Sequence, residues 1–369
     1  MKTSKKRSKL QQAQDKVQAT INLTNITIED LGNHTKKLYE SLTKIQDLID
    51  NIRNIPSDEK FEYKSLEKEK AAWKKQAESI EKEYNKALVK NTGVGAAGAG
   101  LGLAVVTLGP TAAMGVATTF GIASTGTAIA ALGGAAATNA ALAWLGGGAI
   151  VAGGGGMAAG QVFLSMAGPV GWAIAGVSFL ASGLLFFKNS NDKKKLENLF
   201  TAISHRDIKS YQLAIVEILE RIKRIDNESE KLDEAIENIQ TLGFDYDLMT
   251  EKQQYSLGAY VNLMHSSTQL LINPIKGLEA KFSLEDFDSF MVMKSKNIDI
   301  SIYKDSKGLI ISLANMLYKI DIDKETKTLL WKSFRKNKEF LKSMGISKKE
   351  FDIDIIDLAL EALESKYEN

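Results

Sequence analysis

The side chains that most often perform catalysis are few in this chain, and they stand apart from one another. The 369 residues include no cysteine and three histidines, His34, His205 and His265, none of which lies in an HExxH motif or another metal-ligand spacing. A thiolate nucleophile, a thiolate metal site and a disulfide scaffold are therefore excluded. We expect that the protein is not an enzyme and that it uses no metal and no cofactor.

Two further patterns resemble ligand-binding loops but lack residues that such loops require. Asp321, Asp323 and Glu325 alternate as in a calcium loop, yet the glycine and the terminal glutamate of that loop are missing. The glycines of residues 93–100 resemble a phosphate-binding loop, but the chain contains neither GxxxxGKS nor GxxxxGKT. Neither pattern predicts a site.

A basic and aromatic cluster near the C-terminus is the pattern that most favours a ligand. Cationic side chains interleaved with aromatic rings suit contact with a nucleotide or a single-stranded nucleic acid. The candidate residues for binding such an anionic ligand are Trp331, Lys332, Arg335, Lys336 and Lys338. A solvated helix with Trp331 and Phe334 in the core explains the same pattern, because aromatic residues at helical spacing are usually buried.

Residues 91–187 form a run without Asp, Glu, Lys, Arg or His, although charged residues make up 25% of the chain. Most of the 29 glycines lie in this run. Each glycine inside a helix costs about 0.5–1 kcal/mol relative to alanine, so helices there need close packing or lipid. A bilayer is crossed by about 20 apolar residues, and the run is long enough for about four spans.

The flanks and the start of the chain predict where this run is located. Lysines border the run on both sides, so the positive-inside rule places both flanks on the cytoplasmic face and requires an even number of spans, two or four. The first ten residues are basic and polar and are not followed by the apolar stretch of a signal peptide. We therefore expect a protein of the cell inner membrane that is made without a signal peptide.

Small and polar residues inside the run have separate predicted roles. Small residues at four-residue spacing let helix backbones approach each other in lipid. The residues with this spacing are Gly148, Ala152, Gly156, Gly160, Gly171 and Ala175. A channel needs a polar lining. The candidates for that lining include Thr118, Thr119, Thr125, Thr127, Thr138, Asn139 and Gln161.

The alternative interpretation of the run is a buried Gly/Ala-rich helical hairpin in a soluble protein, or a low-complexity segment. Soluble cores of this length usually carry some charged face, which weighs against this alternative.

Apolar residues recur with alternating steps of four and three on both sides of the run, which is typical of coiled coils. The seams lie in residues 38–52, 66–87 and 208–239. The second and third seams can pair antiparallel as a stalk or pair with other subunits, and an ordinary helical bundle within one chain is the alternative.

The predicted fold class is all-α, with long coiled-coil helices flanking a Gly/Ala-rich transmembrane helical hairpin region. Its divisions are residues 1–90, N-terminal coiled-coil helices; 91–187, the membrane-inserting region; 188–242, a coiled-coil helix; and 243–369, a small helical domain with a possible regulatory role.

The order of these parts resembles two known groups of proteins. A charge-free hairpin between coiled coils is similar to the layout of α-helical pore-forming toxins of the cytolysin A and haemolysin BL type. Residues 109–160 also look like the glycine-zipper segment of bacterial membrane-active effectors, including those of antiphage systems. A Hailong-type channel effector, held closed by a nucleic-acid oligomer, is one of these. The resemblance implies membrane insertion and assigns no catalytic or ligand residue.

Three classes of function follow from these patterns. The first is a homo-oligomeric pore or ion channel that depolarises a cell in antiphage defence or toxin action. Its partners are the lipid bilayer and a nucleotide or nucleic-acid oligomer as regulator. The second is a membrane-anchored coiled-coil adaptor or structural protein without channel activity. The third is an interaction protein that stays outside the membrane.

Overall fold

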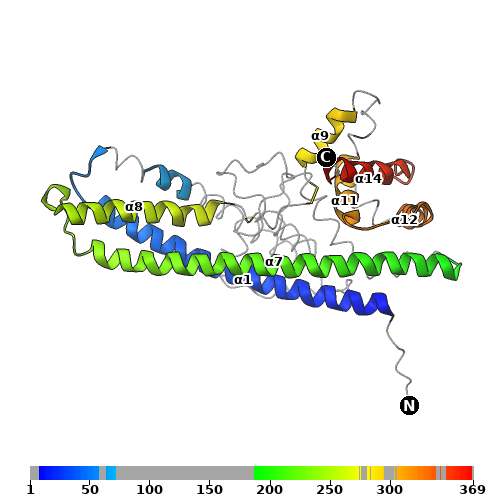
Figure 1. Ribbon diagram of the computed structural model, residues 1–369, viewed down its shortest axis with the longest axis horizontal. Helices are drawn as coiled ribbons and strands as arrows, with labels where there is room; N and C mark the ends of the chain where they lie inside the picture. The colour runs from blue at the N-terminus through cyan, green and yellow to red at the C-terminus, as the bar shows by residue number, and fades with distance from the viewer. Residues whose placement is uncertain are drawn as a thin grey trace, which may run out of the picture.

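The computed structural model describes residues 8–57, 64–71, 187–273, 275, 281–282, 284–294, 303, 306–337, 341 and 346–367. Helices make up 82% of the interpretable residues and no strand occurs among them, which confirms the all-α prediction. Two long helices run along the molecule, and shorter helices lie against them toward each end (Figure 1).

The two long helices are α1 (Lys9–Asp50) and α7 (Ser190–Ile239), and both begin at side-chain caps. Ser8 forms a capping box at the start of α1, and Asn189 accepts a hydrogen bond from a backbone N–H at the start of α7. The helices contain 42 and 50 residues, which corresponds to lengths of about 63 and 75 Å. We refer to α1 and α7 together as the helix pair.

The helix pair is parallel, and its register is constant over the contacts that fix it. His34 contacts Asp226, and the Ser41 hydroxyl donates to Asp233 at 2.8 Å; the partners are 192 positions apart in both cases. A residue of α1 therefore lies level with the residue of α7 that is 192 positions later.

The predicted seam of residues 38–52 is buried along this interface. Its apolar members are all at most 5% exposed and share one core with α7: Leu38, Leu42, Ile45, Ile49 and Ile52. The structure thus joins the first seam to the third, in parallel. The second seam is described only for residues 66–71, where Leu66 enters the same core.

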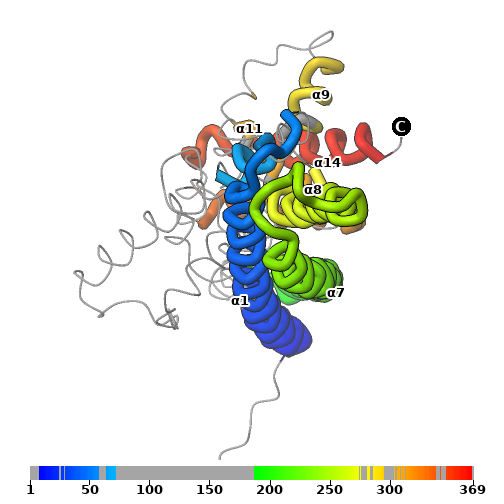
Figure 2. Tube along the Cα trace, turned by 90° about the vertical axis from the view of Figure 1, so that its left-hand side faces the viewer, coloured from blue at the N-terminus to red at the C-terminus, as the bar shows by residue number. Residues whose placement is uncertain are grey.

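At the far end of the helix pair the chain turns back along it. Gly243, with φ at 84°, begins the turn, a short 3-10 helix η4 (Tyr246–Leu248) follows, and α8 (Glu251–Ile272) then runs antiparallel to α7. Figure 2 shows α8 beside both long helices, and it contacts both of them. The Arg53 backbone pairs with Phe244 and Tyr246, which fastens the end of α1 to this turn.

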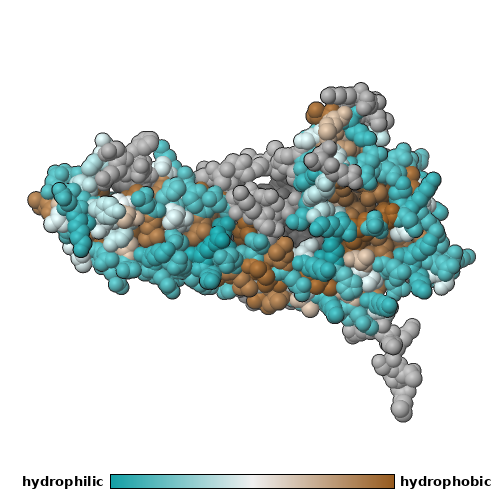
Figure 3. Space-filling view, in the orientation of Figure 1, coloured by the Kyte–Doolittle hydropathy of each residue, from teal (hydrophilic) through white to brown (hydrophobic). Residues whose placement is uncertain are grey.

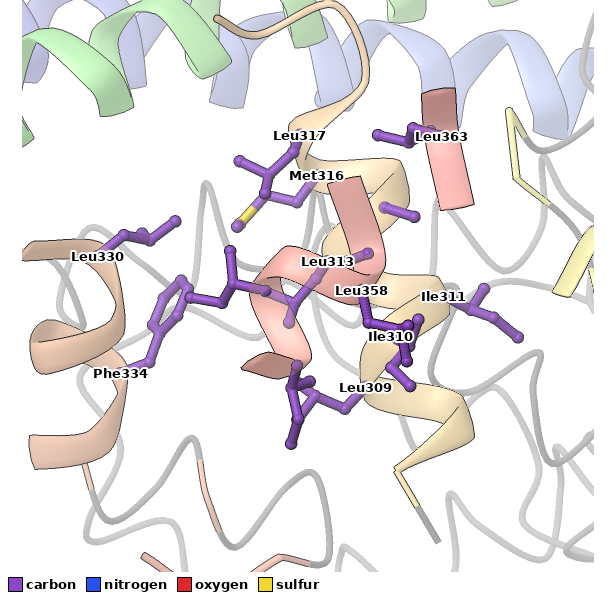
Figure 4. Close-up of a cluster of buried hydrophobic side chains, with 14 of the residues drawn as sticks. Leu309, Ile310, Ile311, Leu313, Met316, Leu317, Leu330, Phe334, Leu358 and Leu363 are labelled. Carbon is purple, nitrogen blue, oxygen red and sulfur yellow. The ribbon is translucent and has the colours of Figure 1, made fainter. Parts of the chain in front are cut away.

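The C-terminal helices form a second core at the opposite end. They are α9 (Leu284–Lys294), α11 (Lys307–Leu317), α12 (Lys324–Lys336) and α14 (Asp354–Tyr367). In Figure 4, Leu313 of α11, Phe334 of α12 and Leu358 of α14 gather in this core. The same core includes Leu10 and Phe200, so the C-terminal helices are packed onto the start of the helix pair.

No helix in the part of the chain that the structure describes is long and apolar enough to cross a membrane. The long helices carry charged residues throughout, such as Lys193–Lys195 in α7, and charged groups are costly in lipid. This finding corrects the prediction of a transmembrane, pore-forming ion channel in the inner membrane with both flanks cytoplasmic. Phe187, the last residue expected in the lipid-facing run, is instead buried in the C-terminal core.

The remaining residues of the predicted membrane run, 91–186, lie outside the described residues. This includes the small residues expected to pack its helices, from Gly148 to Ala175, and the polar residues expected to line a pore, from Thr118 to Gln161. Their predicted roles are therefore not part of the argument that follows.

Candidate interaction surface

Trp331 and Arg335, two members of the predicted anion-binding cluster, contact each other on α12. The Arg335 guanidinium lies over the Trp331 ring at 4.8 Å, and its Nε donates to the Lys348 carbonyl at 3.1 Å. The Trp331 indole N–H donates to the Phe351 carbonyl at 3.1 Å. Because its N–H is already used and a guanidinium lies on its ring, Trp331 acts here mainly in packing.

The lysines of this predicted cluster do not converge on one point. Lys332 is exposed on α12, whereas the Lys336 ammonium lies 5.3 Å from the centre of the Phe187 ring. Lys338 lies outside the described residues. The structure brings Trp331 and Arg335 together but does not group the lysines around them, so anion binding stays a prediction.

Acidic side chains also reduce the positive charge around the predicted anion-binding cluster on α12. Glu325 pairs with Lys195 of α7, and Asp357 of α14 pairs with Lys327. Asp323, from the acidic stretch that resembled a calcium loop, caps α12 by accepting the Thr326 backbone N–H at 2.6 Å. This hydrogen bond lowers the pKa of Asp323. The acidic residues here are thus used in capping and ion pairing.

Arg206 joins the helix pair to the C-terminal helices. Its Nη1 donates to the carbonyls of Asn315, Met316 and Tyr318, at 3.0, 2.7 and 2.9 Å. These carbonyls are at the C-terminal end of α11, where the last turn of a helix leaves acceptors without intrahelical partners. Its Nε and Nη2 donate to Asp207 Oδ1 at 2.9 and 2.6 Å. We call Arg206 and Asp207 the α7–α11 joint.

Asp207 is nearly inaccessible, at 1% exposure, and its second carboxylate oxygen has no hydrogen-bond partner in the structure. Burial raises the pKa of this carboxyl, and the neighbouring Arg206 opposes that shift. The joint therefore buries a carboxyl group whose charged form is stabilised by Arg206.

The three histidines occupy different settings. His34 lies between two carboxylates, contacting Asp226 of α7 and lying 3.6 Å from Asp30 of its own helix. His205 and His265 are exposed. Among the described residues there is no group of three or more acidic or histidine side chains that could hold a metal ion.

A pocket of about 430 Å³ lies along the outer face of α8. It is lined by Tyr246, Glu251, Gln254, Tyr255, Gly258, Ala259, Val261 and Asn262. Glu251 is the only ionisable carboxylate or base among these lining residues, so the pocket offers no acid and base pair.

Five large apolar side chains remain exposed in the middle of the helix pair. Their exposed fractions are 52% for Leu23, 63% for Ile26, 49% for Leu213, 61% for Val216 and 49% for Leu219. Figure 3 shows an apolar patch over this part of the molecule. We call these five residues the mid-pair apolar band.

Two members of the band, Val216 of α7 and Ile26 of α1, point away from the other long helix at nearly the same level. Val216 lies about 160° around α7 from Ile218, which is fully buried in the core shared with α1. Ile26 likewise lies about 160° around α1 from Thr24, which is fully buried. Ile26 is level with Ile218 by the constant register. Each long helix thus presents apolar residues on the side that faces away from the other.

Two cores meet at the band, because Ala214 and Ile218 belong to the large core that α1, α7 and α8 share, whereas a smaller core lies toward the start of the pair. Val17, Ile21 and Tyr211 form a small separate cluster there, with Ile208 packed against it, and all four belong to α1 or α7. On this side of the band, the described part of the chain is only two helices thick. An apolar face of this kind on a long helix suits packing against a further helix.

The sequence contained a signal for this band that the heptad pattern obscured. The heptads assign Ile215 to the seam, but Ala214 is buried in its place and Ile215 is half-buried. Residues 213–219 read LAIVEIL, which is more apolar than one seam requires. A helix that is apolar all round is normally covered on more than one side.

Comparison of the chain with known protein families, with curated proteins and with solved structures found no match in any of the three.

Proposed function

We propose that this protein is a non-catalytic helical scaffold that docks other helices on the sides of its helix pair. This retains the adaptor or structural function of the second class that the sequence predicted. The observation that carries the proposal is the mid-pair apolar band, which presents Ile26 and Val216 at more than 60% exposure on opposite sides of one structure.

The length and order of the helix pair support a scaffold. Each long helix is continuous, so the pair holds its two outward faces at a fixed separation over about 60 Å. The C-terminal helices are fastened at one end through Arg206, and α8 is packed at the other. Among the described residues, the mid-pair apolar band lies between these two groups of helices.

Burial of the band supplies part of the driving force for docking. Covering the exposed half of a leucine, isoleucine or valine side chain contributes roughly 1 kcal/mol. Four or five such residues offset a substantial part of the cost of association, which is about 4–15 kcal/mol. Polar contacts around the band must supply the rest, as in other interfaces with an apolar centre.

Site-specific photo-crosslinking in cells tests the scaffold function. A photoreactive phenylalanine analogue is placed at Val216 on α7 and, in a second protein, at Ile26 on α1. We expect covalent protein adducts from both positions, and mass spectrometry of the crosslinked peptides identifies the residues joined. The matched control carries the same analogue at Lys252, an exposed position on α8 away from the band.

Adducts at the two band positions but not at Lys252 would support the scaffold. Irradiated cells that give no protein adduct from either band position would contradict it, because a docked helix must lie within reach of both side chains.

A further inference from the structure

We propose that the pocket on the outer face of α8 binds an organic cation of the alkylammonium or guanidinium class. The pocket lies at the far end of the helix pair and includes no residue of the mid-pair apolar band. The inference therefore goes beyond the proposed scaffold function and does not rest on it. Three side chains recognise the ligand: the Glu251 carboxylate and the rings of Tyr246 and Tyr255.

Residues of α8 form one wall of the pocket because they lie on the same side of that helix. At 3.6 residues per turn, the lining residues from Val261 round to Ala259 fall within an arc of about 160°. Tyr246 of η4 also lines the pocket, and the Gln254 side chain donates to its carbonyl at 3.0 Å, which holds η4 beside α8. The volume of about 430 Å³ is in the range usual for small-molecule sites.

The charge of the pocket favours a positively charged ligand. Glu251 is exposed and has no ion-pair partner in the part of the chain that the structure describes. No lysine, arginine or histidine is found among the described lining residues. Of the cations at this end, Arg53 pairs with Asp245 at 3.6 Å, and Lys252 does not line the pocket. A concave site with charge of one sign attracts the opposite charge and repels anions.

The two tyrosine rings favour a cation that also has an apolar part. Tyr255 is 82% exposed, so its ring is open to a ligand. The face of an aromatic ring attracts ammonium and guanidinium groups within about 6 Å of its centre. Ala259 and Val261 supply apolar surface for the carbon chain of such a ligand. A metal ion fits less well, because Glu251 is the one carboxylate among the described lining residues.

Gly258 keeps the wall of the pocket open in the middle of α8. Glycine inside a helix is less stable than alanine, so it usually has a separate reason. A Cβ added at Gly258 would meet nothing within 4 Å, so packing among the described residues does not require a glycine there. A side chain at this position has open space and would occupy the pocket instead of the ligand.

Ligand binding to the full-length protein tests the site. The cationic probes are agmatine, which is a free alkylguanidinium, and a short capped peptide with one central arginine. N-acetylglutamate is the anionic control. Saturation-transfer NMR titrations measure each dissociation constant. We expect both cations to bind with dissociation constants of about 1 mM or lower at low salt, and N-acetylglutamate not to bind.

The two cationic probes distinguish the sources of the ligand. Tighter binding of the peptide would identify the arginine side chain of a partner protein. Tighter binding of agmatine would identify a free small cation. Both results support the same recognition chemistry, because each ligand presents a guanidinium group on a carbon chain.

Three variants locate binding in the pocket. Glu251→Gln should weaken agmatine binding about three- to tenfold, and Tyr255→Leu about two- to fivefold. Gly258→Leu should abolish binding by filling the pocket. Glu237→Gln on α7 is the matched control, since it removes an exposed carboxylate that does not line the pocket and should bind like wild type. Circular dichroism and the thermal midpoint check that each variant is folded.

Three results would overturn the inference. The first is no binding of either cation up to about 10 mM, and the second is equal binding of N-acetylglutamate. The third is equal weakening by Glu251→Gln and Glu237→Gln, which would show attraction to overall charge and no local site. None of them affects the scaffold function, which is tested separately by crosslinks from Ile26 and Val216.

Discussion

Helix α7 is built differently at its α11 contact and at its middle, although the two regions are only about ten residues apart. At the α7–α11 joint, Arg206 makes five hydrogen bonds and Asp207 is almost fully buried. At the middle, Val216 is 61% exposed, although Ala214 and Ile218 near it are buried in the core that α1, α7 and α8 share.

The α7–α11 joint is a contact whose partners all belong to this chain, whereas the mid-pair apolar band is exposed. Buried charge is tolerated at the joint because the same guanidinium compensates the carboxylate and the carbonyls at the end of α11. In the middle, the apolar side chains of the mid-pair band stay about half exposed or more. The joint should therefore control stability, and the band should control association. The following predictions test that division, beginning with the largest effect.

Arg206→Ala should lower the free energy of unfolding by about 3–5 kcal/mol, because it leaves Asp207 buried without a cation and frees three carbonyls of α11. Denaturant unfolding followed by circular dichroism measures this change. Arg224→Ala is the matched control, since Arg224 forms an exposed ion pair and should change stability by less than about 0.5 kcal/mol. Equal losses in the two variants would refute the special role of the joint.

Asp207 should also make stability depend on pH. Burial, against the effect of Arg206, raises the pKa of its carboxyl above the ordinary value of about 3.9. Between the pKa of Asp207 in the unfolded chain and its higher pKa in the folded protein, the folded protein binds more protons. The free energy of unfolding therefore falls as the pH rises through this range.

Asp207→Asn removes that titration while keeping the shape of the side chain. We expect the stability of the asparagine variant relative to wild type to increase as the pH is raised from 4 to 7. Unfolding curves at a series of pH values measure the difference, and a constant difference would show that Asp207 titrates alike in the folded and unfolded states.

Ile218 and Val216 compare the buried and outward sides of α7 at nearly the same height. Ile218→Ala should cost about 2–4 kcal/mol because the side chain is fully buried. Val216→Ala should change the stability of the single chain by no more than about 0.5 kcal/mol. Chemical denaturation at low protein concentration measures both, and similar costs would mean that the band is already covered within one chain.

The smallest predicted effect is at Ser229, where the substitution should increase stability. It is fully buried and its hydroxyl has no hydrogen-bond partner in the structure, so Ser229→Ala should stabilise the fold by about 1 kcal/mol. Ser204 is the matched control on the same helix: it is equally buried, but its hydroxyl donates to the Phe200 carbonyl at 2.8 Å. Thermal unfolding should show no gain for Ser204→Ala.

Several features of the fold were predictable because they depend on residues close together in the sequence. The alternating spacing of Leu38, Leu42 and Ile45 identified buried positions, and each is at most 1% exposed. The all-α class followed from the same periodicity. The interpretation of Phe334 as a core residue was also confirmed, since it is 1% exposed.

The membrane prediction failed for the described residues because composition identifies apolar surface but not what covers it. Phe187 ends a charge-free run, yet in the structure it is covered by the C-terminal core and by the Lys336 side chain. The sequence could not predict whether α1 and α7 run parallel or antiparallel, because a heptad seam fits either kind of partner.

The sequence by itself determined which residues form helices and which face of each helix is apolar, since capping and periodicity act within a few turns. Only the tertiary structure decided that α1 and α7 run in parallel with a constant register, and that Arg206 fastens the C-terminal helices to α7. The mid-pair apolar band was also visible only in the tertiary structure. The exposure of a side chain depends on which helices pack together, and α1 and α7 are almost two hundred residues apart in the sequence.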